Sequence, residues 1–166
     1  MLTGVIDWFR ERSLPRSHRR RIRAARRTLA LLTDWLRQDG DRAAPRVFGY
    51  LRKIDPLAFE ELALEAFRRA GVRVKRGRRY SGDGGVDGHV LHNAKWCPIQ
   101  CKRYRNHIDP DHVRAFTRIV ERSHVPRGYF IHTGRTGDAS WEARGSAVRM
   151  ISGHRLIDLL RGQVPR

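Results

Sequence analysis

Apolar residues recur every three or four positions in the first part of the chain, which is the spacing of one face of a helix. The periodic run extends from about Arg19 to Arg37, and Gly40 and Asp41 follow it. Its apolar positions are Ile22, Ala25, Leu29, Leu32 and Leu36. The pattern therefore predicts a single amphipathic helix that ends near Gly40.

From about Val47 the pattern changes to short strand-like runs that alternate with helical stripes. The pairs Asp55–Pro56 and Asp109–Pro110 each precede an apolar stripe, so each predicts an N-cap and a first helical residue. Short apolar runs bounded by glycine, proline or asparagine predict strands, and two of them form a hairpin around residues 93–96. The expected strands are 72–75, 86–92, 98–104, 128–133 and 149–152, and two further helices are 138–148 and 154–161.

The predicted order of elements from residue 55 onward is α-β-β-β-α-β-α-β-α. Hairpin strands followed by helix-linked strands are typical of an α/β fold with a mixed central sheet flanked by helices. The 166 residues are enough for one domain and a modest appendage. We therefore expect a basic helical N-terminal extension over residues 1–45 and an α/β domain over residues 46–166.

The charge of the chain indicates the class of partner. Lysine and arginine total 35 against 17 acidic residues, which gives a formal net charge of +18. This excess favours nucleic acid over a membrane, because no apolar run approaches the roughly 18 residues that span a bilayer. No signal peptide is visible at the start of the sequence, and the two cysteines do not indicate a disulfide framework, so we expect a cytoplasmic protein.

Arginines are concentrated between residues 10 and 27, where Glu11 is the only acid. Three interpretations are open. The arginines can be the solvated face of a helix docked on the α/β domain, an arm that neutralises DNA phosphates, or part of a coiled-coil or membrane-surface contact. The candidate DNA contacts in this segment are Arg19, Arg20, Arg21 and Arg23.

A glycine-rich turn and the strand that follows it carry the candidate chemistry. The turn contains Asp87, and the strand contains Gln100 and Lys102. Because side chains on a strand alternate between its two faces, Gln100 and Lys102 point to one side of the sheet. Ile99 and Cys101 point to the other side. An acid, an amide and a lysine are thus expected at neighbouring strand ends.

These residue types suit the hydrolysis of a phosphodiester. A hard cation such as Mg²⁺ prefers oxygen ligands, which the Asp87 carboxylate, the Gln100 amide and the Cys101 carbonyl offer. Lys102 can then lower the pKa of a water, orient that water, or contact the phosphate as a cation.

The helix after Asp55 offers a further acid. Its apolar stripe leaves out Glu60, Glu61 and Glu65, so one of these can face a site at the edge of the helix. Glu60 can reach the same metal directly or through a water.

Thr133 lies at the end of an apolar strand, directly before Gly134 and Arg135. Two roles are open for its hydroxyl: contact with a phosphate, or capping of a helix.

Four segments of the chain carry a family resemblance. FEELALEAFRRAGVRVKRGRRYSGDGGVDGHV, PIQCKRY, GYFIHTGRTGDAS and HRLIDLL resemble the catalytic domain of Mrr-like restriction endonucleases, a branch of the PD-(D/E)xK nuclease superfamily. The likeness covers about residues 55–162. It implies a restriction-endonuclease-like sheet flanked by helices and Mg²⁺-dependent DNA cleavage, with Mn²⁺ as a possible substitute. It also implies that Asp87, Gln100 and Lys102 form the catalytic set and that Glu60 is an additional acid.

Two departures limit what the resemblance implies. The basic extension is too short for a full winged helix, so target specificity does not carry over. Gln100 stands where most of the superfamily has an acid, although the Mrr-like group shares the amide. An amide carries no charge, so metal affinity should depend more strongly on Asp87 and Glu60.

The expected function is that of a metal-dependent DNA endonuclease, comparable to type IV restriction enzymes. One alternative is a structure-selective nuclease such as a Holliday-junction resolvase, and another is a DNA-binding module without catalysis. The expected partner is double-stranded or branched DNA. A homodimer is expected because each domain would hold one catalytic centre. Further candidate DNA contacts are Arg103, Thr133 and Arg135.

Overall fold

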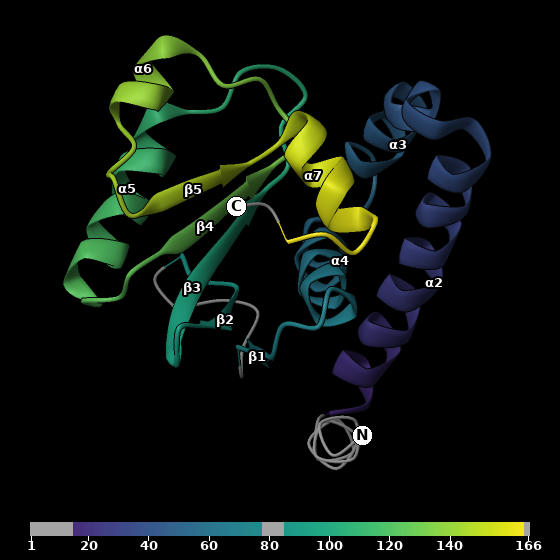
Figure 1. Ribbon diagram of the computed structural model, residues 1–166, viewed down its shortest axis with the longest axis horizontal. Coiled ribbons are helices and arrows are strands. Elements are labelled where there is room, and N and C mark those ends of the chain that lie inside the picture. The colour runs from purple at the N-terminus through teal and green to yellow at the C-terminus, as the bar shows by residue number, and fades with distance from the viewer. Residues whose placement is uncertain (1–14, 78–84, 165–166) are drawn as a thin grey trace.

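The computed structural model describes residues 15–77 and 85–164, which form a central sheet with helices on both faces (Figure 1). The five strands lie in the order β1-β2-β3-β4-β5. They are β1 Val74–Arg76, β2 Gly88–His92, β3 Lys95–Lys102, β4 Gly128–His132 and β5 Val148–Ile151. The first three strands pair antiparallel and the last three pair parallel. The predicted mixed sheet is therefore confirmed.

The helices of the described residues follow the predicted order, with two short additions, η1 and α3, near the start. They are α2 Arg16–Asp39, the 3₁₀ helix η1 Gly40–Ala43, α3 Ala44–Leu51, α4 Pro56–Arg69, α5 Pro110–Arg122, α6 Asp138–Glu142 and α7 Gly153–Leu160. Helices α5 and α6 lie on one side of the sheet, and α4 and α7 lie on the other with α2 outside them (Figure 1). No helix in these described ranges is both long enough and apolar enough to cross a bilayer.

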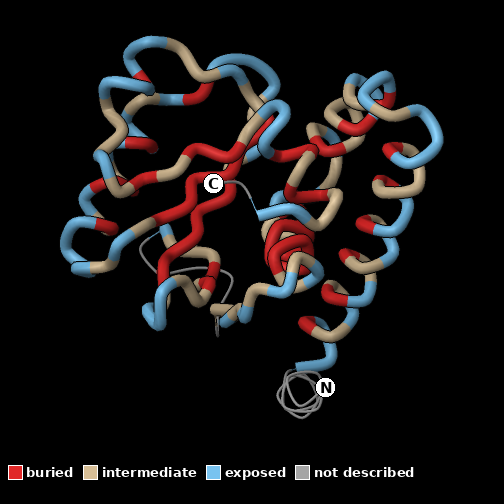
Figure 2. Tube along the Cα trace, in the orientation of Figure 1, coloured by how far each residue is buried: buried red, intermediate tan, exposed pale blue. Residues whose placement is uncertain are grey.

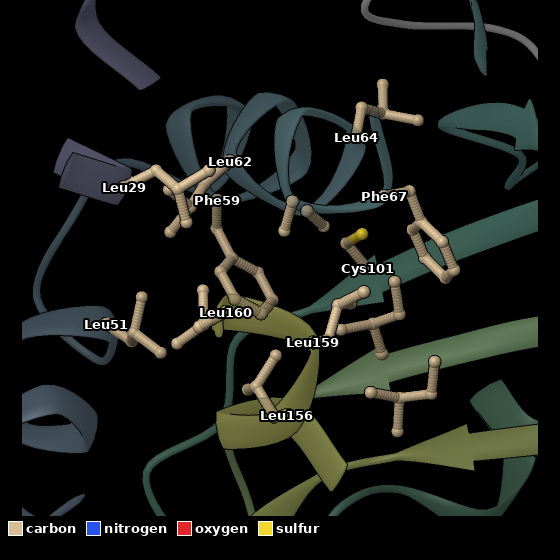
Figure 3. Close-up of a cluster of buried hydrophobic side chains, with 14 of the residues drawn as sticks. Leu29, Leu51, Phe59, Leu62, Leu64, Phe67, Cys101, Leu156, Leu159 and Leu160 are labelled. Carbon is tan, nitrogen blue, oxygen red and sulfur yellow. The ribbon is translucent and has the colours of Figure 1, made fainter. Parts of the chain in front are cut away.

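Helix α2 buries one face against the rest of the molecule (Figure 2). Its five predicted apolar positions are 0–4% exposed, which confirms the amphipathic helix. Four of them, Ala25, Leu29, Leu32 and Leu36, belong to the same hydrophobic cluster as α4 and α7. Figure 3 shows Leu29 of α2 next to Leu62 of α4. Burying a leucine stabilises a fold by roughly 1.5–3 kcal/mol, so the docking of α2 contributes several kcal/mol. The basic helix therefore shares the core of the α/β domain.

Two hydrophobic clusters lie on opposite faces of the sheet. The larger one joins Ile99 and Cys101 of β3 to α4, α7 and α2, and the smaller one joins Phe130 of β4 to α5. This confirms the predicted alternation along β3. Gln100 follows the α5 face, since Gly85 lies against both its amide and Ile119 of α5.

The two predicted N-caps are present. An Asp55 carboxylate oxygen accepts a hydrogen bond from the backbone N–H of Ala58 at 3.2 Å. Asp109 accepts one from the backbone N–H of Asp111 at 2.8 Å. Each bond satisfies an amide that the first turn of a helix leaves without an intrahelical partner.

The sequence pattern was wrong about two helical segments. Helix α3 was not predicted; its buried side chains are only Val47 and Leu51, too few for a recognisable stripe. The helix predicted over 138–148 ends at Glu142. The Thr117 hydroxyl accepts a hydrogen bond from the Gly145 N–H at 3.1 Å and donates one to the Ala143 carbonyl at 3.2 Å. These contacts with α5 hold the chain in a non-helical path.

The β2–β3 hairpin turns at Asn93 and Ala94, which have φ angles of 47° and 60°. Two successive positive φ values are typical of the two-residue turns that match the twist of paired strands. His92 therefore pairs with Lys95, and Gly88 pairs with Ile99. This register decides which residues meet at the far end of the hairpin.

Candidate active site

The start of β2 and the end of β3 bring Asp87 next to Cys101. The Asp87 N–H donates to the Ile99 carbonyl at 2.8 Å, one residue beyond the last pair of the hairpin. The Asp87 carboxylate accepts a hydrogen bond from the backbone N–H of Cys101 at 2.6 Å. Asp87 is thus held against the strand that carries Gln100 and Lys102.

Glu60 and Lys102 lie within electrostatic reach of Asp87. Burial, together with the nearby charges of Asp87 and Glu61, raises the pKa of Glu60 to about 8 against the opposing charge of Lys102. Burial also raises the pKa of Asp87 to about 6, although the Cys101 N–H and Lys102 act in the other direction. A bound cation would favour the ionised forms of both acids, so this pair of raised pKa values indicates a possible cation site.

Gln100 lies on the α5 face of β3, one residue before Cys101 and two before Lys102. Its side chain is 6% exposed, and its Oε1 has no hydrogen-bond partner among the described residues. A Cβ at Gly85, where φ is +91°, would lie 2.7 Å from Gln100 Nε2. The glycine therefore lets the chain pass close to the amide. A buried oxygen that accepts no hydrogen bond is unfavourable, unless a bound ligand or cation interacts with it.

The other two acids of α4 have a different role from the one their sequence pattern indicated. Glu61 and Glu65 are 2% and 1% exposed, so they are not at the solvated edge of the helix. Arg76 Nε donates to Glu61 at 2.8 Å, and Arg76 Nη2 also donates to Glu65. Arg26 and Arg68 donate to Glu65 at 3.0 and 2.8 Å. The expectation that these acids lie outside the buried stripe was therefore wrong.

Comparison with known proteins decides the family of the chain. The family model for a restriction endonuclease domain, Mrr_cat, matches residues 51–160, which is more than half of the chain. The chain belongs to this restriction endonuclease family. The predicted resemblance is therefore confirmed, and the matched region runs from the end of α3 to the end of α7. It includes Glu60, Asp87, Gln100 and Lys102 and leaves α2 outside.

Among solved structures, the chain is similar to "MspJI Restriction Endonuclease in Complex with 27-mer Oligonucleotide". The identity is 24% and the TM-score is 0.41. The likeness covers 83% of this chain and 31% of that one, so the chain spans about a third of the other protein's length. No curated protein matches the chain.

The donors at this site of the restriction endonuclease domain fit a hard divalent cation. Asp87 and Glu60 supply carboxylates, and Gln100 Oε1 supplies an oxygen with no other described partner. Over residues 15–77 and 85–164, no three His, Cys, Asp or Glu side chains gather into a metal-binding group. A cation held here would therefore need oxygen donors besides carboxylates, such as the Gln100 amide, which oxygen-preferring cations accept.

Thr133 has neither of the roles that its sequence position left open. Its side chain is 0% exposed, and its hydroxyl donates to the Tyr104 carbonyl at 2.8 Å and accepts from the Tyr104 N–H at 3.0 Å. Helix α6 begins at Asp138 with Gly137 as its N-cap, so Thr133 does not cap it. The hydroxyl instead joins the chain after β3 to the end of β4.

The predicted arginine contacts fall on two separate parts of the fold. On α2, Arg20 and Arg23 are exposed, whereas Arg19 and Arg21 are partly buried. Arg103 and Arg135 are exposed in the loops after β3 and β4. DNA binding by these side chains stays a prediction.

His132 is a buried titratable residue beside the site that the sequence pattern did not single out. It pairs with Lys102 across β3 and β4 and is 0% exposed. Burial lowers its pKa to about 4, so the ring is neutral at physiological pH. Lys102 therefore has a neutral neighbour on the adjacent strand.

Proposed function

We propose that the chain is a metal-dependent DNA endonuclease of the Mrr type, with its catalytic centre at Glu60, Asp87, Gln100 and Lys102. The observation that carries the proposal is the grouping of two acids with raised pKa values around Lys102. A lysine beside acids that have no arginine partner among residues 15–77 and 85–164 is a suitable arrangement for a phosphate and a divalent cation together. Family membership supports a nuclease, and the net charge of +18 supports a polyanionic substrate.

Asp87, Gln100 and Glu60, with the Cys101 carbonyl, would hold Mg²⁺, or Mn²⁺ in its place. When bound, the cation supplies positive charge at the scissile phosphate and lowers the pKa of water. The hydrogen bond from the Cys101 N–H fixes the orientation of the Asp87 carboxylate. Lys102 would hold the attacking water or a phosphate oxygen, and its charge favours the ionised forms of Asp87 and Glu60.

A cleavage assay tests this proposal. Purified protein is incubated with plasmid, methylated plasmid and branched DNA in Mg²⁺, Mn²⁺ or EDTA. We expect cleavage that requires the metal and is lost in Lys102→Ala while DNA binding survives. Lys95→Ala is the matched control, because Lys95 lies at the opposite end of β3 and is exposed. Equal activity of Lys102→Ala and Lys95→Ala would contradict the proposed centre.

The same assay separates the alternatives. Cleavage confined to branched DNA would favour a structure-selective nuclease such as a Holliday-junction resolvase. Binding without cleavage on every substrate and metal would favour a DNA-binding module.

We also propose that two copies of the chain act together when both DNA strands are cut, because each chain carries one such centre. Sedimentation with and without a duplex measures this association. A monomer that makes double-strand breaks at a rate linear in protein concentration would contradict it.

A further inference from the structure

The loops that leave β3 and β4 are joined to each other beyond the ends of the strands. Because β3 and β4 are parallel, both loops start at the same edge of the sheet. The Arg135 N–H donates to the Asn106 carbonyl at 2.9 Å, and the Ile108 N–H donates to the Arg135 carbonyl at 3.0 Å. We call residues 103–108 together with 133–137 the loop platform.

Further contacts hold the loop platform in one conformation. The Thr133 hydroxyl makes two hydrogen bonds to the backbone of Tyr104, and both Nε and Nη2 of Arg52 donate to the Thr133 carbonyl, at 3.1 and 3.0 Å. At Gly134 a Cβ would lie 2.5 Å from the Asn106 carbonyl oxygen, so no larger residue fits there without separating the loops. The platform is therefore a fixed backbone support.

The outward side of the loop platform is basic. Arg103, Arg105, His107 and Arg135 are exposed, and residues 103–108 and 133–137 contain no acid. Arg103 donates to the Arg52 carbonyl at 2.9 Å. No side-chain hydrogen bond or ion pair joins Arg105 or Arg135 to a residue of the described ranges. Both guanidinium groups are thus available on a rigid base.

This availability distinguishes them from other arginines of the fold. Arg26, Arg68 and Arg76 are bonded to buried acids of α4. A guanidinium with no acid partner can bind a phosphate through two hydrogen bonds at once, and such contacts position a duplex. The free pair therefore has the chemistry of phosphate binding, whereas the bonded arginines stabilise the fold.

The loop platform begins at the residue directly after Lys102, so it adjoins the proposed catalytic centre. We propose that it binds the DNA backbone beside the cleaved bond, with Arg105 and Arg135 as the phosphate contacts. This inference rests on the proposed function, since it takes DNA as the substrate of that centre. The DNA phosphate contacts are thus assigned to Arg105 in addition to Arg135. Thr133 stabilises the loop platform through its hydrogen bonds to Tyr104.

Salt-dependent DNA binding tests the inference in the full-length chain. Fluorescence anisotropy of a labelled duplex is recorded over a KCl series in EDTA, where metal-dependent cleavage does not occur. In the double variant Arg105→Ala with Arg135→Ala, we expect the slope of log Kd against log salt to flatten by about 1.8, since each phosphate contact contributes about 0.9. Arg105→Lys with Arg135→Lys should keep most of the slope, because the charges remain.

The charge-matched control is Arg118→Ala with Arg122→Ala. Both residues are exposed and lie in the last part of α5, toward the start of β4. Circular dichroism confirms that each variant is folded. A wild-type slope in the platform variant, or an equal loss in the control, would overturn the inference.

DNA binding in EDTA tests the loop platform, and cleavage in Mg²⁺ tests the nuclease, so either proposal can fail without the other. A flattened slope in a protein that cleaves nothing would keep the loop platform as a DNA-binding surface and contradict the nuclease. Metal-dependent cleavage with an unchanged slope in the platform variant would keep the nuclease and contradict the phosphate contacts.

Discussion

Helix α4 carries acids in two different surroundings within two turns of each other. Glu61 and Glu65 are paired with arginines, and Glu60 is not paired with an arginine of the described residues. Glu65 is 1% exposed and receives hydrogen bonds from Arg26, Arg68 and Arg76. Burial alone would raise its pKa, but these partners hold the pKa below its usual value. Glu60 has no arginine partner in the described structure, and its pKa is raised to about 8.

The difference separates acids of α4 that stabilise the fold from an acid of the same helix that has no arginine partner among the described residues. Acids neutralised by arginines form a bridge between α2, α4 and β1, which secures the fold. An acid that faces another acid is unfavourable in its ionised form until a cation arrives. The charge that the fold leaves uncompensated therefore indicates where a ligand would bind.

The largest expected effect comes from breaking the compensated group. Glu65→Ala would leave Arg76, whose side chain is 11% exposed, with one acid fewer. Removing one partner of a buried ion pair destabilises a fold by roughly 3–5 kcal/mol, and urea unfolding measures it. The control is Asp34→Ala, which breaks an exposed pair with Arg37 and should cost less than about 1 kcal/mol. An equal loss of unfolding free energy in Glu65→Ala and Asp34→Ala would show that the buried ion pairs of Glu65 stabilise the fold no more than an exposed pair does.

The next effect concerns the uncompensated group. Asp87→Asn keeps an acceptor for the Cys101 N–H but removes the charge. We expect Mn²⁺ affinity, measured by calorimetry, and DNA cleavage to fall by more than the roughly 10- to 100-fold typical of changes around a metal ligand. Asp111→Asn on the exposed start of α5 is the control. Unchanged Mn²⁺ affinity in Asp87→Asn would show that Asp87 does not bind the metal.

A pH series sharpens the comparison further. Metal binding requires ionised carboxylates, and the pKa values of Glu60 and Asp87 are about 8 and about 6. Mn²⁺ affinity should fall about tenfold per pH unit from pH 8 to 6, where Glu60 must lose its proton, and more steeply below 6. Glu60→Gln should remove the dependence between pH 8 and 6. A flat profile for the wild-type chain would contradict Glu60 as a ligand.

The last effect concerns stability without metal. A carboxyl whose pKa is raised in the folded state binds its proton more tightly there, so its contribution is favourable at low pH and is lost as pH rises from 4.5 through 8. Glu60→Gln should therefore gain stability relative to wild type at pH 8 and not at pH 4, where both side chains are uncharged. Thermal melts in EDTA measure the difference. Lower stability of Glu60→Gln than of wild type at pH 8 would show that neighbouring groups stabilise the ionised form of Glu60.

Local patterns predicted most of the elements because their causes are local. The apolar spacing of α2 and the caps Asp55 and Asp109 depend on residues within a few positions of one another. Helix α3 escaped prediction because it is short, and α6 was predicted too long because contacts with Thr117 end it. Those contacts join residues more than 20 positions apart, which a local pattern does not record.

The candidate site was predictable in its residue types and less so in its arrangement. Gln100 and Lys102 share a face because strand side chains alternate. The hairpin register that places Asp87 against Cys101 follows from a turn at Asn93 and Ala94. Helical spacing could not separate Glu60 from Glu61 and Glu65, because their partners come from β1 and α2.

By itself the sequence determined the α/β class and the amphipathic basic helix, and it proposed the candidate residues for binding a cation and a phosphate. Periodicity and residue chemistry are properties of neighbouring positions, so they can be read along the chain. Over the described residues, the tertiary structure decided which acids are paired with arginines, which arginines have no acid partner, and that Thr133 supports a loop. Those outcomes depend on groups that meet only after folding, since charge compensation and burial arise between distant segments.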